Sequence, residues 1–124
     1  MSVRISVRVV SKRKERSAVI ALPGESIVDL DRSHPVLGNR YILKNHNDDQ
    51  ERRRVIAAYV RDLDADIQSD GPMAKEIRLL AERALAGERL ALRCWCAPRG
   101  CHVDQVRARI FQVVGQDPNE FFLQ

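Results

Sequence analysis

The spacing of apolar residues changes three times along this chain, and that pattern constrains its fold more than any other feature. Apolar and polar residues alternate within residues 3–9, which predicts a strand with one solvated face. In two stretches within residues 55–84 the apolar positions recur about every four residues, as on helices that bury one stripe. Alternation returns at residues 90–96, and helical spacing follows within residues 103–113. Strands and helices that follow one another in this way indicate the α/β class.

Local signals mark the ends of the helices. Asp48, with Glu51 three residues later, has the spacing of a capping box. Pro72 suits the first turn of a second helix, and Gly87 is a natural C-terminal cap. We therefore expect helices over about residues 48–68, 72–86 and 102–114.

The segment before these helices is marked less sharply. Residues 17–22 form a short apolar run, and residues 27–30 read as a further strand. The irregular segment 31–47 follows, and loops of that length tend to be functional. The whole chain, residues 1–124, is predicted to be one α/β domain with at least one parallel crossover, and residues 115–124 form a docked end or a tail.

Composition excludes several classes of protein. Hydrophobic content of 44% and charged content of 31% are ordinary for a globular domain. No apolar run approaches the roughly 18 residues that span a membrane, and the first residues lack the apolar core of a signal peptide. We therefore expect a cytoplasmic protein, in which cysteines stay reduced. The net charge of +4 is modest, and acids flank the basic clusters at residues 12–16 and 52–54, which favours solvated surface over nucleic-acid contact.

All three cysteines lie in a nine-residue segment that crosses from a predicted strand to a predicted helix, and three interpretations of it remain open. In the first, the segment binds zinc, since thiolates and imidazole are preferred zinc ligands. The ligands would be Cys94, Cys96, Cys101 and His102. Structural zinc sites usually take ligand pairs from two separate parts of the chain, whereas these four come from one. On spacing, the sequence predicts no cofactor and no stoichiometric zinc.

In the second interpretation, the same segment forms one wall of a ligand pocket at a helix N-terminus. Free N–H groups and partial positive charge there hold phosphates or carboxylates and lower the pKa of a thiol. Arg99 and Gly100 would contact the ligand. The candidates for catalytic work are Cys101, His102 and Asp104. In the third interpretation the cysteines fill the core, since cysteine is among the most buried residue types.

A second candidate loop, residues 32–39, leaves another predicted strand. It carries a cation at Arg32 and the pair Gly38 and Asn39, which would bind and orient a ligand. Read alone, the pair is a simple turn. Two loops that leave parallel strands at one sheet edge face a common crevice, however, and ligands of open α/β sheets bind there.

Three motifs of these loops occur together: Leu37-Gly-Asn39, a helix beginning near Glu51, and Cys94-Trp-Cys-Ala-Pro98 leading to Cys101-His102-x-Asp104. Over about residues 26–114 they resemble domain-of-unknown-function family 4326, which is common in bacteria and their phages. The family typically has Pro-Phe where this chain has Arg40-Tyr41, and glycine where it has Val103. The resemblance implies a Rossmann-like fold related to domains that bind nucleotides or nucleotide-derived ligands, some of which cleave N-glycosidic bonds.

Together these observations predict a small Rossmann-like protein that binds a nucleotide-like or other anionic small molecule. The reaction that the resemblance suggests is hydrolysis or transfer at a nucleoside. One alternative is a zinc-stabilised interaction module built on the cysteine-histidine cluster. The other is a nucleic-acid-binding accessory protein that uses its arginine-rich faces and stacks bases on Trp95 or Tyr41. No membrane partner is expected.

Overall fold

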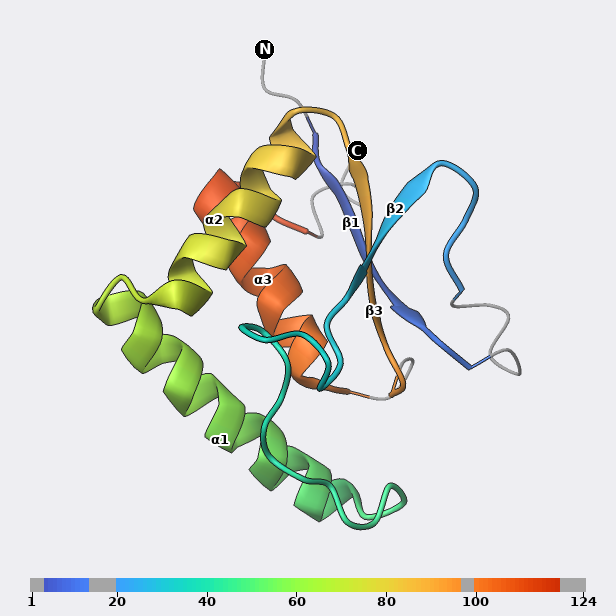
Figure 1. Ribbon diagram of the computed structural model, residues 1–124, viewed down its shortest axis with the longest axis vertical. Coiled ribbons are helices and arrows are strands. Elements are labelled where there is room, and N and C mark those ends of the chain that lie inside the picture. The colour runs from blue at the N-terminus through green and yellow to red at the C-terminus, as the bar shows by residue number, and fades with distance from the viewer. Residues whose placement is uncertain (1–3, 14–19, 97–99, 119–124) are drawn as a thin grey trace.

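The computed structural model describes residues 4–13, 20–96 and 100–118, which form three strands and three helices (Figure 1). The strands are β1 (Ser6–Ser11), β2 (Glu25–Asp29) and β3 (Arg89–Cys94), and the helices are α1 (Asp49–Gln68), α2 (Pro72–Leu85) and α3 (His102–Val114). The predicted α/β class is confirmed.

The sheet is parallel throughout, and its strand order is β1-β3-β2. Leu92 of β3 pairs with Val9 on one side and with Val28 on the other. Because β3 is the central strand, it is buried on both faces, and Ala91 and Leu92 are both 0% exposed. The carboxyl ends of all three strands therefore lie at the same edge of the sheet.

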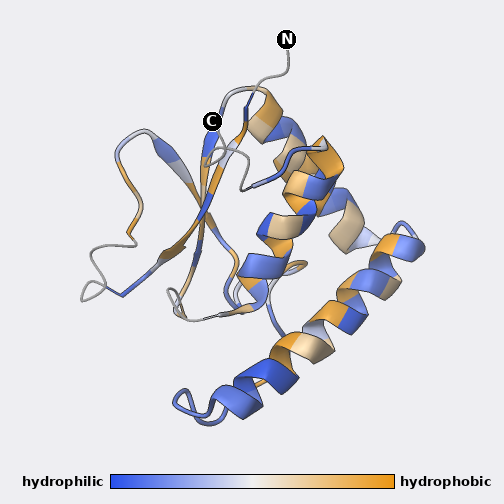
Figure 2. Cartoon of the chain, turned by 180° about the vertical axis from the view of Figure 1, so that it is seen from behind, coloured by the Kyte–Doolittle hydropathy of each residue, from blue (hydrophilic) through white to orange (hydrophobic). Residues whose placement is uncertain are grey.

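The helices lie on one face of the sheet, so the domain has two layers (Figure 1). Helices α2 and α3 pack together, and α1 contacts them at the end of the layer. Apolar and polar bands alternate along the helices, and the strands also carry both kinds of residue (Figure 2). The predicted inward positions Ile77, Leu80 and Ala84 of α2 are all about 1% exposed, which confirms the helical pattern.

The predicted helix boundaries agree with the structure. Asp48 accepts a hydrogen bond from the backbone N–H of Glu51 at 3.0 Å, as in a capping box. The reciprocal half is absent among the described atoms, because the Glu51 carboxylate accepts from the backbone N–H of Lys44 instead. Pro72 opens α2, and Gly87 follows it with a φ of 102°.

Two details of the predicted pattern are wrong. Residues 20–22 are not a strand, and Ile20 and Leu22 are exposed, while residues 17–19 lie outside the described chain. Val113 was expected to face inward but is 53% exposed, because Val114 packs against the core in its place.

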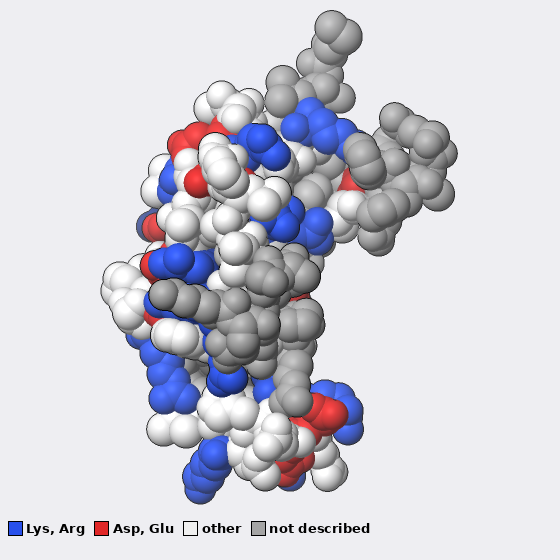
Figure 3. Space-filling model, turned by 90° about the vertical axis from the view of Figure 1, so that its right-hand side faces the viewer, with Lys and Arg blue, Asp and Glu red and all other residues white. Residues whose placement is uncertain are grey.

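Ion pairs cover the face of the sheet that has no helices. Arg8 of β1 reaches across the central strand to the Glu25 carboxylate with two bonds of 2.8 and 2.6 Å. Arg93 makes a similar fork with Asp29, its neighbour in the register. Basic side chains with acidic ones among them are visible on this side of the molecule (Figure 3). Charged side chains thus pair across strands where a third layer would otherwise pack.

Acid will weaken this face of the sheet. Hydrogen bonds from Lys12 and Ser33 lower the pKa of Asp31 to about 2, and arginine partners also lower the pKa of Glu25 and Asp29. Such a carboxylate stabilises the fold above its unfolded-state pKa of about 4, and this contribution disappears as pH falls through the folded-state value. We expect the free energy of unfolding, from urea titrations, to fall between about pH 4.5 and pH 2, with about 2 kcal/mol of the loss from Asp31.

The control for this prediction is Lys12→Met, which removes the main cause of the lowered Asp31 pKa. Its stability should be lower than that of the wild type at pH 7 and should depend less on pH in the acid range. An unchanged slope in this variant would contradict the assignment.

Candidate functional site

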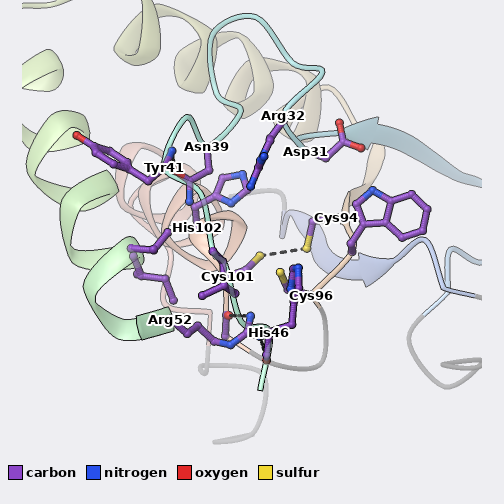
Figure 4. Close-up of a pocket in the computed structure, with 15 residues that line it drawn as sticks. Asp31, Arg32, Asn39, Tyr41, His46, Arg52, Cys94, Cys96, Cys101 and His102 are labelled. Atoms are coloured by element: carbon purple, nitrogen blue, oxygen red, sulfur yellow. Dashed lines mark hydrogen bonds between the residues drawn. The ribbon is translucent and has the colours of Figure 1, made fainter. Parts of the chain in front are cut away.

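A cavity of about 120 Å³ opens at the carboxyl edge of the sheet (Figure 4). Its walls come from the loop after β2, the first turns of α1, the end of β3 and the start of α3. The residues that line it are Asp31, Arg32, Asn39, Tyr41, Leu43, His46, Arg52, Val55, Ile56, Cys94, Trp95, Cys96, Gly100, Cys101 and His102. The two loops that the sequence singled out therefore border one cavity.

Close packing within the loop after β2 fixes its path. A Cβ atom on Gly38 would lie 2.5 Å from the carbonyl oxygen of Asp31 and 2.6 Å from that of His34, so only glycine fits there. The His34 ring accepts a hydrogen bond from the backbone N–H of Leu37 at 2.9 Å, and the Tyr59 hydroxyl donates to the Leu37 carbonyl at 2.9 Å. These contacts fix the loop beside α1, and they therefore also fix the backbone at Arg32 and Asn39.

Arg52 is the buried cation of the site, at 7% exposure. Its guanidinium donates to the carbonyl of His46 at 2.7 Å and to the carbonyl of Gly100 at 3.2 Å, so it joins the two loops. Its Nε–H has no hydrogen-bond partner among the described atoms, and none of the described carboxylates pairs with it. A buried guanidinium with a spare donor at a cavity wall is a favourable place for an anion.

The three cysteines converge beside Arg52. Their sulfur atoms lie within 4.8 Å of one another, and the sulfurs of Cys94 and Cys101 are 3.0 Å apart. Hydrogen bonding with Cys101 and then Cys94 lowers the pKa of Cys96, and Arg52 lowers it further. Hydrogen bonding with Cys94 and then with Cys96, together with burial, raises the pKa of Cys101. Cys96 is therefore the group of the cluster that most readily becomes a thiolate.

The turn into α3 is capped from within. Cys101 is the N-cap, its sulfur accepts from the backbone N–H of Val103, and the Asp104 carboxylate accepts from the Cys101 N–H at 3.0 Å. Asp104 does not line the cavity among the described residues, and its carboxylate serves this cap. The helix N-terminus was expected to lower the pKa of Cys101, but the neighbouring sulfurs have the larger, opposite effect.

His102 connects the two strand-exit loops. Its Nε2 lies 2.6 Å from the carbonyl oxygen of Leu30, and its ring packs against Tyr59 at a centroid distance of 5.0 Å. Burial lowers the pKa of His102, so the ring is neutral near pH 7 and its Nε2–H donates to Leu30. The imidazole lines the cavity, but its Nε2 is bonded to the Leu30 carbonyl and so joins the two loops.

The remaining candidates occupy different positions. Arg32 is exposed at the rim of the cavity and forms no ion pair with any described residue. Asn39 also lines the cavity, and its side-chain oxygen accepts from the backbone N–H of Tyr41 at 2.9 Å. Gly38 supports the loop from outside the cavity, and Arg99 lies outside the described residues.

Arg52 is the site residue that the sequence interpretation missed. It was assigned to a basic, solvated cluster, although it precedes Ile56, Tyr59 and Leu63 by four, seven and eleven residues. Those spacings place it on the buried stripe of the helix, which is a signal that the sequence contained. The solvated interpretation does hold for its neighbours Arg53 and Arg54, which are exposed.

The arrangement also shows that a metal ion could be held here. Cys94, Cys96 and Cys101 offer three sulfur ligands at one point, whereas His102 is not part of this group. The spacing of the cysteines along the chain does not indicate this grouping, which arises because α3 begins beside the end of β3 and so brings the Cys101 sulfur to 3.0 Å from that of Cys94.

None of the helices in the described chain is long and apolar enough to cross a membrane.

Comparisons with known proteins give one match. No curated protein and no solved structure matches the sequence. The sequence profile of the family described as domain of unknown function (DUF4326) matches residues 10–112. This match spans most of the 124 residues and both walls of the cavity, and the chain therefore belongs to the DUF4326 family.

Proposed function

We propose that this protein binds an anionic, nucleotide-like small molecule in the cavity at the carboxyl edge of its sheet. The observation that carries the proposal is the presence of two guanidinium groups on one cavity, Arg52 in the wall and Arg32 at the rim. In the view of Figure 4 they lie on either side of the three sulfurs. Neither has a carboxylate partner among the residues that the structure describes.

Charge and shape both support an anion with an attached ring. Guanidinium groups bind phosphate and carboxylate oxygens in two-pronged contacts, and these are strongest where water is excluded. Trp95, which is half exposed, and Tyr41 both line the cavity, so aromatic side chains border the space that a planar group would occupy. A position outside the carboxyl ends of parallel strands is also where nucleotides bind in Rossmann-like sheets.

Chemistry on the bound molecule is a further part of the proposal. Hydrolysis or transfer at a nucleoside needs a nucleophile or a base beside the ligand. In the protein without a bound metal ion, Cys96 fits that role better than Cys101, because it is more exposed and its pKa is lowered. His102 and Asp104 position the loops in this scheme, since each is engaged in a bond to the backbone.

Removing the rim guanidinium will test the proposal. Nucleosides, nucleoside mono- and diphosphates and inorganic pyrophosphate are first screened by thermal shift, and affinities are then measured by calorimetry. For the compounds that bind, Arg32→Ala should weaken binding about tenfold to a hundredfold, since a charge-assisted bond contributes about 1.5–3 kcal/mol. The melting temperature without ligand should not change, because Arg32 is exposed and has no ion pair with the described residues.

Arg53→Ala is the matched control. It removes the same charge from an exposed position on α1 that does not line the cavity, and it should bind as the wild type does. Equal affinities for wild type and Arg32→Ala, or no binding of any phosphate compound, would refute the proposal.

A further inference from the structure

The three cysteines form a second binding element in the wall of this cavity. We infer that Cys94, Cys96 and Cys101 bind a single soft metal ion, with zinc as the best match, and leave one coordination position open toward the cavity. This inference does not depend on the proposed anionic ligand.

The distances between the sulfurs fit one ion. With metal–sulfur bonds of about 2.3 Å, two sulfurs of a tetrahedral zinc site lie about 3.8 Å apart. The three sulfurs here are within 4.8 Å of one another, and the closest pair is 3.0 Å apart, so side-chain rotations that change the sulfur–sulfur distances by up to about 1 Å would suffice. An iron–sulfur cluster needs its cysteine sulfurs farther apart, which leaves a mononuclear ion.

The charges around the cluster also fit. Three thiolates and one divalent zinc carry a net charge of −1, which the buried guanidinium of Arg52 beside Cys96 offsets. Binding releases the thiol protons to solvent. Without a metal, the three sulfurs share a small space with a buried cation. The metal–thiolate group would therefore provide a counterion for Arg52.

The ligand set distinguishes this site from a closed structural one. Structural zinc sites have four protein ligands, whereas catalytic sites have three and keep the fourth position for water or substrate. No histidine or carboxylate among the described residues joins the three sulfurs, and His102 is bonded to the Leu30 carbonyl. All three cysteines line the cavity, so the open position faces the space where a ligand would lie.

Direct metal titration tests the inference. Reduced, metal-stripped protein is titrated with Zn²⁺ in competition with a chromophoric chelator, and with Co²⁺ under anaerobic conditions as a spectroscopic probe. We expect one Zn²⁺ per chain, and for Co²⁺ a sulfur-to-metal charge-transfer band with intense tetrahedral d–d bands. At a free Zn²⁺ concentration of 100 times Kd, the melting temperature should rise by on the order of 10 °C.

Cys96→Ser is the informative variant, because Cys96 is only half-buried and the fold should survive its replacement. Its zinc affinity should fall at least a hundredfold and its charge-transfer band should weaken. His46→Ala changes a cavity-lining side chain outside the sulfur cluster and should bind zinc as the wild type does.

Two results would overturn the inference. One is failure of the stripped, reduced wild type to bind Zn²⁺ more tightly than about micromolar. The other is equal affinity in Cys96→Ser. Neither result bears on the pyrophosphate and nucleotide titrations, which are made without metal and with Arg32 as the variable.

Discussion

Replacing Gly38 with alanine will lower the free energy of unfolding by about 3 kcal/mol. The new Cβ would sit 2.5 Å from one carbonyl oxygen and 2.6 Å from another, and both belong to the backbone of the same loop. Neither can rotate away as the end of a side chain can, so the loop itself must open. Forced overpacking of this kind typically costs about 1–3 kcal/mol, and the double contact places Gly38 at the upper end. Urea or guanidinium titrations followed by circular dichroism would measure the loss.

Gly100→Ala is the comparison for this experiment. Among the described residues, a Cβ atom there meets only the Ile56 side chain, at an ordinary distance of 3.8 Å, so the change in stability should stay within about 0.5 kcal/mol. Because Gly38 supports the backbone around Asn39, its variant should also lose ligand affinity. If both alanine variants were equally stable, the loop would have room that the structure does not show.

Arg52→Ala is expected to cost about 2–4 kcal/mol of stability. The substitution removes a side chain that is 7% exposed, with its packing, and two charge-assisted bonds that hold the carbonyls of His46 and Gly100. Arg52→Lys keeps the charge but cannot span both carbonyls, so it should recover only part of the loss. Thermal and chemical unfolding measure these differences.

Arg54→Ala provides the baseline, because Arg54 is exposed two positions further along α1. Its stability should lie within about 0.5 kcal/mol of the wild type. A loss in Arg52→Ala no larger than this would mean that the two loops are held together by other contacts. In that case the link through His102 and Leu30 would be the principal one.

Much of the fold follows from local patterns in the sequence. The predicted helix ends agree with the structure because Asp48, Pro72 and Gly87 each act on the backbone within a few residues of themselves. The two candidate loops were correctly placed at one edge of the sheet because strands joined by helical crossovers are parallel. Both inferences need only the neighbours of each residue and general geometric rules.

Most of the missing parts depend on contacts between distant segments. The sulfur cluster is the exception, because it forms where α3 begins beside the end of β3 and places Cys101 against Cys94, seven residues earlier, which no rule of spacing predicts. The pairing of Arg8 with Glu25 spans a strand that lies between them in space but more than 60 residues later in the chain. The role of His102 depends on meeting the Leu30 carbonyl, 72 residues away. Residue types indicated that these side chains mattered but not what they contact.

The order of the strands has a consequence for how the chain reaches its native state. In the sheet of the described residues, β1 and β2 make no ladder with each other and pair only with β3, which comes after α1 and α2 in the chain. During synthesis the hydrogen-bonding edges of β1 and β2 therefore stay unpaired until residues 89–94 have been made and can insert between them. Such late, non-local pairing slows folding and leaves unpaired strand edges available for wrong partners. We expect the folding rate to be set by the insertion of β3, so that substitutions at Ala91 slow folding, whereas substitutions on the outer face of α1 leave the folding rate unchanged.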